Sequence, residues 1–206
     1  MEEIKDENFD DDIKVILIGE MATGKTSLIN TSIGLEFKHK VKSTQSNSIM
    51  QKKVTIDDKT YIINLWDTIG QEIFRSLTSI FMKDAKIVIF VYDITRLDTF
   101  TQIVEFWYDN AKEVLGDEPI MGIVGNKEDL YLESKVSDNI VQEFIKDKDI
   151  PFQLTSAKIP KNFNDFLELL IRKYIQKYGK IKKDNISIKL GKENKNTKKT
   201  KNKSCC

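Results

Sequence analysis

One segment near the N-terminus constrains the fold more than any other. A short apolar run at residues 13–18 ends at Gly19, and the next residues, G-E-M-A-T-G-K-T, fit the pattern G-x-x-x-x-G-K-[ST]. Residues 25–33 then have the composition of a helix. A loop between a buried strand and a helix turns backbone N–H groups toward an anion. The segment therefore predicts a triphosphate-binding loop at the carboxyl end of a parallel strand.

Strand and helix patterns alternate along the rest of the chain. Further strands are expected at 49–56, 61–66, 87–92, 120–124 and 152–154, and helices at 70–82, 98–115, 138–148 and 163–178. This alternation predicts an α/β fold in which helices cover both faces of a mostly parallel six-stranded sheet. The carboxyl ends of the parallel strands then share one edge, where ligands collect.

The phosphate loop contains the first candidate ligand-binding residues. Lys25 is expected to bridge the β- and γ-phosphates, and the Thr26 hydroxyl to bind Mg²⁺. The residues expected to hold the nucleotide here are Gly19, Met21, Ala22, Thr23, Gly24, Lys25, Thr26 and Ser27.

A second motif, D-T-I-G-Q-E, begins at Asp67 and follows the strand expected at 61–66. Asp67 can hold a Mg²⁺-bound water, and the N–H of Gly70 can contact the γ-phosphate. Gln71 can orient the attacking water, and it is the candidate catalytic residue.

A third motif, N-K-E-D, follows the strand at 120–124 and contains Asn126, Lys127 and Asp129. The Asp129 carboxylate can accept hydrogen bonds from N1–H and the 2-amino group of guanine. Adenine lacks this donor pair, and the mismatch would leave a buried carboxylate unpaired. A nucleotide kinase that uses ATP is the alternative, and Asp129 argues against it. After the last strand, Ser156, Ala157 and Lys158 are expected near the guanine oxygen.

These motifs, in this order, resemble the Ras superfamily, and the Rab family within it. The resemblance covers 13–178 and includes W-D-T-x-G-Q-E at 66–72, V-Y-D-I-T at 91–95 and the Cys-Cys ending. It implies a P-loop small-GTPase fold and a switch that binds GTP or GDP with Mg²⁺ and hydrolyses GTP slowly. By this resemblance Phe37 stacks on the guanine and Lys127 covers its other side. Thr44 binds Mg²⁺ and contacts the γ-phosphate.

The two ends of the chain differ sharply in charge. Residues 1–12 form an acidic, flexible N-terminus with a net charge of −6, and 179–206 carry +8. The basic tail is poor in apolar residues and is expected to be disordered. Its lysines alone suit nucleic acid, an anionic membrane or a merely solvated segment. The sequence has no apolar run long enough to span a membrane and no N-terminal pattern of a secretory signal. The chain is therefore expected to face the cytoplasm.

The Rab resemblance decides between these readings of the tail. It implies that Cys205 and Cys206 carry prenyl groups, so that the protein attaches to the cytoplasmic face of Golgi or endosomal membranes and keeps a cytosolic pool. Nucleic acid is then not expected. The implied partners are an exchange factor, an activating protein, a dissociation inhibitor and effectors, acting in vesicle traffic.

Three residues depart from the usual family pattern: Met21 in the phosphate loop, Ser46 where glycine is usual, and Ile69 where alanine is usual. Met21 would crowd the entry of an activating arginine, and Ile69 adds bulk near the water. They are either neutral drift or they favour an alternative function, a scaffold that binds GTP but barely hydrolyses it. Single-turnover hydrolysis would separate the two functions.

Overall fold

The strand order of the sheet brings the predicted motifs together. The computed structural model describes residues 12–39, 48–68 and 80–196, with the backbone alone for 179–196. Six strands form one sheet in the order β2-β3-β1-β4-β5-β6, in which only the β2–β3 pair is antiparallel. The strands are β1 (Asp12–Ile18), β2 (Ser48–Ile56), β3 (Lys59–Asp67), β4 (Ile87–Asp93), β5 (Ile120–Asn126) and β6 (Phe152–Leu154). The predicted six-stranded, mostly parallel sheet is confirmed.

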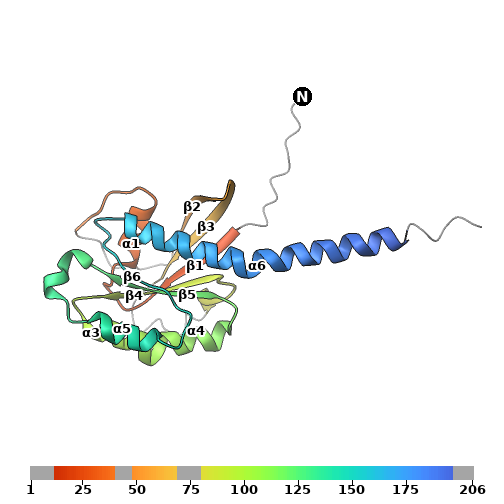
Figure 1. Cartoon of the computed structure of the whole chain (residues 1–206). Coiled ribbons are helices and arrows are strands. Elements are labelled where there is room, and N and C mark those ends of the chain that lie inside the picture. Colours follow the sequence, from red (N-terminus) through yellow and green to blue (C-terminus); the bar gives the residue numbers. More distant parts are fainter. Residues whose placement is uncertain (1–11, 40–47, 69–79, 197–206) are drawn as a thin grey trace, which may run out of the picture.

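Helices cover both faces of the sheet, as predicted (Figure 1). On one face lie α1 (Lys25–Ser32) and α6 (Lys161–Asn196). On the other lie α3 (Leu97–Gln102), α4 (Tyr108–Leu115) and α5 (Asp138–Ile145). Side chains of a strand alternate between faces, so Val15 and Leu17 of β1 pack under α1 and α6, whereas Ile16 and Ile18 pack under α3. The central strands β1, β4 and β5 are buried on both faces, which explains their nearly continuous apolar runs. The edge strand β2 instead alternates between half-buried and exposed residues.

The helix expected at 98–115 is not uniform. A π-helical turn, η2 (Ile103–Trp107), separates α3 from α4. A 3₁₀ helix, η3 (Glu128–Glu133), directly follows the N-K-E-D motif and was not expected from the sequence. Of the helix expected at 70–82, only 80–82 lie within the described residues, and they are helical.

The C-terminal helix differs from its predicted end at residue 178. In the structure α6 continues to Asn196, and Figure 1 shows it extending beyond the sheet. The added segment contains no proline, but Gly179 and Gly191 lower its helix propensity. A helix without neighbours also gains little stability from packing. The acidic end at 1–12, the domain boundary at 178 and the unfolded basic tail stay predictions. None of the described helices is long and apolar enough to cross a membrane.

Candidate functional site

The predicted site residues follow the carboxyl ends of the strands. The phosphate loop follows β1, Asp67 ends β3, Asn126 ends β5, and Ser156 lies just after β6. In the sheet β1 lies between β3 and β4, so the strand order reverses at β1. Open α/β sheets bind ligands in the crevice at such a reversal point.

The backbone of the phosphate loop requires its two glycines. Gly19 and Gly24 both have positive φ angles, of 153° and 95°. A Cβ on Gly19 would overlap the carbonyl oxygen of Val91, and one on Gly24 would overlap the Asn126 amide. Gly24 precedes α1 and has no side chain to cap it, so the first N–H groups of the helix face the loop. The loop thus has the backbone that a phosphate site needs.

The Lys25 side chain is folded into the phosphate loop. Its Nζ atom donates hydrogen bonds to the main-chain oxygens of Gly19, at 2.7 Å, and Glu20, at 3.0 Å. Burial lowers the pKa of the Lys25 ammonium to about 8, although the carboxylates of Asp67 and Glu20 act in the opposite direction. A cation buried among carbonyls is suited to an anionic ligand that compensates its lost hydration.

Thr26 and Asp67 bring two oxygen ligands together. Thr26 Oγ1 donates a hydrogen bond of 2.7 Å to Asp67 Oδ2, and Asp67 is buried. Among the described residues no group of three or more acidic, histidine or cysteine side chains could hold a metal. One hydroxyl and one carboxylate nevertheless suit Mg²⁺, which usually takes few protein ligands beside phosphate oxygens and water. These two residues fit the predicted metal site.

The segment after β5 is tied to the phosphate loop and to β4. The Asn126 amide donates a hydrogen bond of 2.8 Å to the main-chain oxygen of Thr23. Lys127 adopts a positive φ of 68°, and its Nζ lies 2.6 Å from the buried Asp93 carboxylate. The Lys127 ammonium is therefore paired with Asp93.

The predicted base-reading residues meet around one carboxylate. Ser156 Oγ donates to Asp129 Oδ1 at 2.6 Å, and Lys158 Nζ contacts Asp129 Oδ2 at 2.5 Å. Burial alone would raise the pKa of the Asp129 carboxyl, but the hydrogen bonds from Lys158 and Ser156 outweigh it and lower the pKa below its usual value. The side chain is thereby kept as an ionised acceptor, the form that guanine requires.

Phe37 completes the base side of the site. The Lys158 ammonium lies 5.9 Å from the centre of the Phe37 ring, within cation–π range. Phe37 is partly buried against the core, and Ala157, between Ser156 and Lys158, is buried. Ser27, in the first turn of α1, is half-buried. Phe37, Lys158 and Asp129 therefore surround one region, as a stacked base would need.

Five predicted residues lie outside the described residues: Thr44, Gly70, Gln71, Cys205 and Cys206. The departures Ser46 and Ile69 lie there as well. Their assignments stay predictions.

Three residues at the site were not anticipated. Trp107 Nε1 donates a buried hydrogen bond of 3.0 Å to Glu20 Oε1, and Arg96 Nη1 donates to the Met21 oxygen at 3.1 Å. Glu20 occupies a position that the phosphate-loop pattern leaves free. The acid in an anion-binding loop could have indicated this contact, because a buried acid needs a hydrogen-bond donor as its partner.

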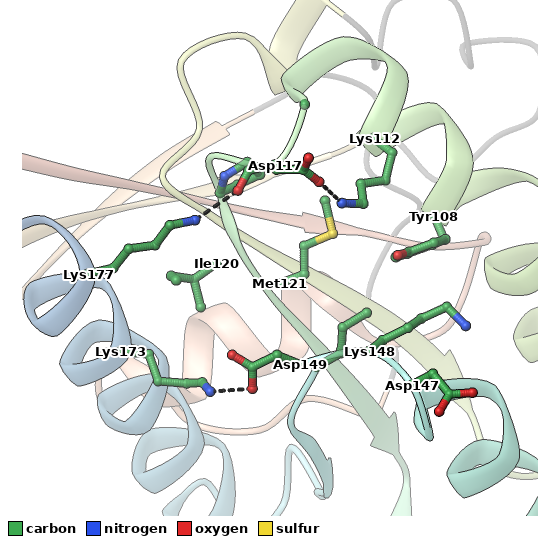
Figure 2. A pocket seen from close by; sticks show the side chains of 13 residues that line it. Tyr108, Lys112, Asp117, Ile120, Met121, Asp147, Lys148, Asp149, Lys173 and Lys177 are labelled. Atoms are coloured by element: carbon green, nitrogen blue, oxygen red, sulfur yellow. Dashed lines mark hydrogen bonds and ion pairs between the residues drawn. The ribbon is translucent and has the colours of Figure 1, made fainter.

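A hollow of about 380 Å³ lies at the opposite end of the sheet, where β5 begins at Ile120 (Figure 2). Its lysines are engaged: Lys112 pairs with Asp117, Lys173 pairs with Asp149, and Lys177 donates to main-chain oxygens of Asp117 and Glu118. The lysines of this hollow are therefore engaged within the protein.

Comparisons with known proteins identify the family. The family model for the Ras family matches residues 14–176. The bovine protein "Ras-related protein Rab-7b" is 34% identical over 187 residues, covering 88% of this chain and 92% of its own length. Human Rab-7b is 34% identical over 184 residues, covering 87% and 92%. "Ras-related protein Rab-11C" of Dictyostelium discoideum is 35% identical over 158 residues, covering 77% and 70%. The chain is therefore a GTPase and belongs to the Rab family of the Ras superfamily.

Proposed function

We propose that this Rab GTPase is a membrane-anchored switch in vesicle traffic that binds GTP or GDP with Mg²⁺ and hydrolyses GTP slowly. The observation that carries the proposal is the 2.7 Å hydrogen bond between Thr26 and Asp67 beside the buried Lys25. When bound, Mg²⁺ would offset the negative charge on the phosphate oxygens. Thr26, Asp67 and Thr44 are the residues proposed to hold it.

The remaining roles follow the chemistry of phosphoryl transfer, in which a protein chiefly positions groups and neutralises charge. Lys25 and the backbone of 19–26 bind the phosphates, and the N–H of Gly70 contacts the γ-phosphate. Gln71 orients the attacking water. Asp129, supported by Ser156 and Lys158, selects guanine.

A Mg²⁺-dependence measurement tests the nucleotide site. Lys25→Ala should lose most of its affinity for fluorescent GDP, and Asp67→Ala should make binding insensitive to Mg²⁺. Lys53→Ala, which removes an exposed lysine from β2, is the matched control and should bind as wild type does. Unchanged GDP affinity in Lys25→Ala would contradict the proposed phosphate site.

The anchor is proposed to be the pair Cys205 and Cys206. Two prenyl chains hold a protein on a membrane stably where one does so reversibly, and the lysines of 179–206 add attraction to anionic lipid. The proposed location is the cytoplasmic face of Golgi or endosomal membranes. The proposed partners are an exchange factor, an activating protein, a dissociation inhibitor and effectors. Replacing both cysteines by serine should move the chain to the cytosol, and unchanged partition would refute the anchor.

A second function, a scaffold that stays bound to GTP, is favoured by one observation. The Met21 side chain stands half exposed on the phosphate loop, where an activating residue would approach. Single-turnover hydrolysis of radiolabelled GTP separates the functions. A slow but measurable rate that falls in Gln71→Leu supports the switch, and no detectable hydrolysis supports the scaffold.

A further inference from the structure

Glu20 is an acid inside the loop that is proposed to bind phosphate, and it is buried. Only 6% of its surface is exposed. A buried carboxylate is costly unless hydrogen bonds compensate its lost hydration. Trp107 supplies one of them, from a residue far away in sequence, at 3.0 Å between Nε1 and Oε1. The bond fixes where the Glu20 side chain points.

The main chain of Glu20 is engaged as well. Its carbonyl oxygen accepts hydrogen bonds from Lys25 Nζ, at 3.0 Å, and from Thr23 Oγ1, at 2.9 Å. One residue therefore connects Trp107 to the Lys25 ammonium. A rotation of Glu20 would move its carbonyl and its side chain together.

The local helix geometry sets the direction of the Trp107 side chain. Trp107 is the last residue of the π-helical turn η2, and it is buried. A π turn includes one extra residue and so changes the phase of the side chains along the helix. Trp107 lies at the end of this turn, and its indole N–H contacts Glu20 of the phosphate loop. Such single turns recur at functional sites.

A second contact comes from the same segment. Arg96, just before α3, donates from Nη1 to the main-chain oxygen of Met21 at 3.1 Å. The Arg96 side chain is 42% exposed and also pairs with Asp98. Its contact is therefore weaker than the buried one, but it holds the residue next to Glu20.

We propose that Trp107 is a positioning residue for nucleotide binding: through Glu20 it holds the phosphate loop and the Lys25 ammonium in the arrangement that receives phosphate. This inference rests on the proposed phosphate site at 19–26. It assigns to the helical segment after β4 a role in how long the nucleotide stays bound. Trp107 acts through Glu20 and is not itself expected to touch the nucleotide.

Trp107→Phe tests the inference, because it keeps an aromatic ring and removes the N–H donor. In the full-length protein, release of fluorescent GDP should become faster by about tenfold or more, since a hydrogen bond to a buried charged group is among the stronger ones. Tyr178→Phe is the control, because it also removes one hydrogen-bond donor from an aromatic ring, here the Tyr178 hydroxyl that donates to the Glu118 main-chain oxygen at the opposite end of the sheet. Its release rate should stay within about threefold of wild type, the scatter expected of a distant site.

Variants of Glu20 distinguish positioning from general stability. Glu20→Gln keeps an acceptor for the indole and should release GDP almost as slowly as wild type. Glu20→Ala should release GDP as fast as Trp107→Phe. Combining Trp107→Phe with Glu20→Ala should add little to either change alone, because both remove the same contact. Additive effects that follow the melting temperature would assign Trp107 a purely structural role and overturn the inference.

An NMR measurement keeps the inference testable if Trp107→Phe does not fold. In the wild-type protein, the Trp107 indole N–H signal should shift when GDP is removed. An unresponsive Trp107 signal, or wild-type release from a folded Trp107→Phe, contradicts the inference. If Lys25→Ala loses GDP while Trp107→Phe behaves as wild type, the role of Trp107 alone fails. If Lys25→Ala also binds as wild type, the phosphate site itself fails.

Discussion

The side-chain amide of Asn126 donates a hydrogen bond of 2.8 Å to the main-chain oxygen of Thr23. This contact joins two predicted motifs that lie on different strands, the phosphate loop and the base-reading segment. Gly24 lies so close that a Cβ there would overlap the same amide. One buried hydrogen bond therefore fixes the distance between the two motifs. A bound nucleotide would have to span that distance between its phosphates and its base.

Asn126→Asp should separate the two motifs. A carboxylate cannot donate to the Thr23 oxygen, and two buried acceptors would face each other without a proton. Leaving buried groups unpaired costs about 1–3 kcal/mol, so GDP affinity should fall by about tenfold or more. Asn64→Asp is the matched control, because Asn64 accepts its hydrogen bond from Gln51 and can do so as aspartate. Isothermal titration with GDP gives both values, and equal affinities would show that the contact does not matter.

Asp129→Asn should change the preferred base. The carboxylate, held by Ser156 at 2.6 Å, is expected to accept two donors from guanine. An asparagine offers one donor and one acceptor, which suits the oxygen of xanthine instead. Mismatched hydrogen bonds can discriminate by about 10⁴–10⁵. Competition between GTP and xanthosine triphosphate checks this, and retention of wild-type GTP affinity would mean that Asp129 does not read the base.

Lys158→Met should alter the acid limit of guanine binding. The pKa of Asp129 is lowered because Lys158 and Ser156 outweigh the effect of burial. A lowered pKa keeps the carboxylate ionised as pH falls, so base recognition is present above the ordinary pKa and is lost only below it. Without Lys158 that pKa should rise, and GDP affinity should begin to fall at higher pH than in wild type. Fluorescent GDP titrations between about pH 3.5 and 7 test the shift around the ordinary pKa of Asp; identical profiles would contradict it.

Tyr92→Phe should stabilise the domain. The Tyr92 hydroxyl is buried without a hydrogen-bond partner among the described residues, and its ring packs against Phe100 and Phe152. Burial raises the pKa of this phenol above its ordinary value. Removing an unsatisfied hydroxyl should increase the free energy of unfolding by about 1 kcal/mol. Urea denaturation measures it, and Tyr131→Phe, at an exposed tyrosine, should be neutral. A loss of stability in Tyr92→Phe would reveal a partner for the hydroxyl.

The sheet was predictable because burial leaves a direct mark on sequence. Every expected strand is present. The central strands β1, β4 and β5 are apolar on both faces because both faces are covered, whereas β2 and β3 alternate between more and less buried residues. The residues at which the strands end were harder to predict. β3 extends to Asp67, whose backbone still pairs with Leu17 and Ser48 although its side chain is charged. Backbone pairing does not depend on side-chain polarity, so pattern alone ends this strand too early.

The π turn and the contacts of Glu20 could not be predicted in the same way. The buried residues Phe100, Ile103, Trp107 and Ala111 have the sequence spacing of an uninterrupted helix, so the pattern does not indicate the extra residue at Ile103–Trp107. The motif pattern names the glycines, Lys25 and Thr26 of the loop because their chemistry is fixed. It does not specify Glu20, and the partner of Glu20, Trp107, is identified only when the fold brings the loop after β1 next to η2. Lys127 is similar, since its pairing with Asp93 depends on β4 and β5 lying side by side.

Met21→Gly, combined with Ile69→Ala, should make the protein more responsive to an activating protein. The Met21 side chain is 50% exposed, while its main-chain oxygen is held by Arg96 at 3.1 Å. Removing the side chain should therefore open space without releasing the loop. An activating arginine contributes roughly 10³–10⁵ in rate where it can enter, so even partial crowding should be measurable. Ile140→Ala, which truncates a comparably exposed apolar residue on α5, should change nothing.

The measurement is hydrolysis of radiolabelled GTP, with and without a matched activating protein, by wild type, each single variant and the combination. Gln71→Leu in the same series should abolish the stimulation, because it removes the residue expected to orient the water. The rate with activator should rise from wild type to the combined variant, while the intrinsic rate changes little. If wild type is already stimulated as strongly as the combined variant, Met21 and Ile69 do not obstruct the arginine. A rise in the intrinsic rate alone would instead indicate that Ile69 crowds the water.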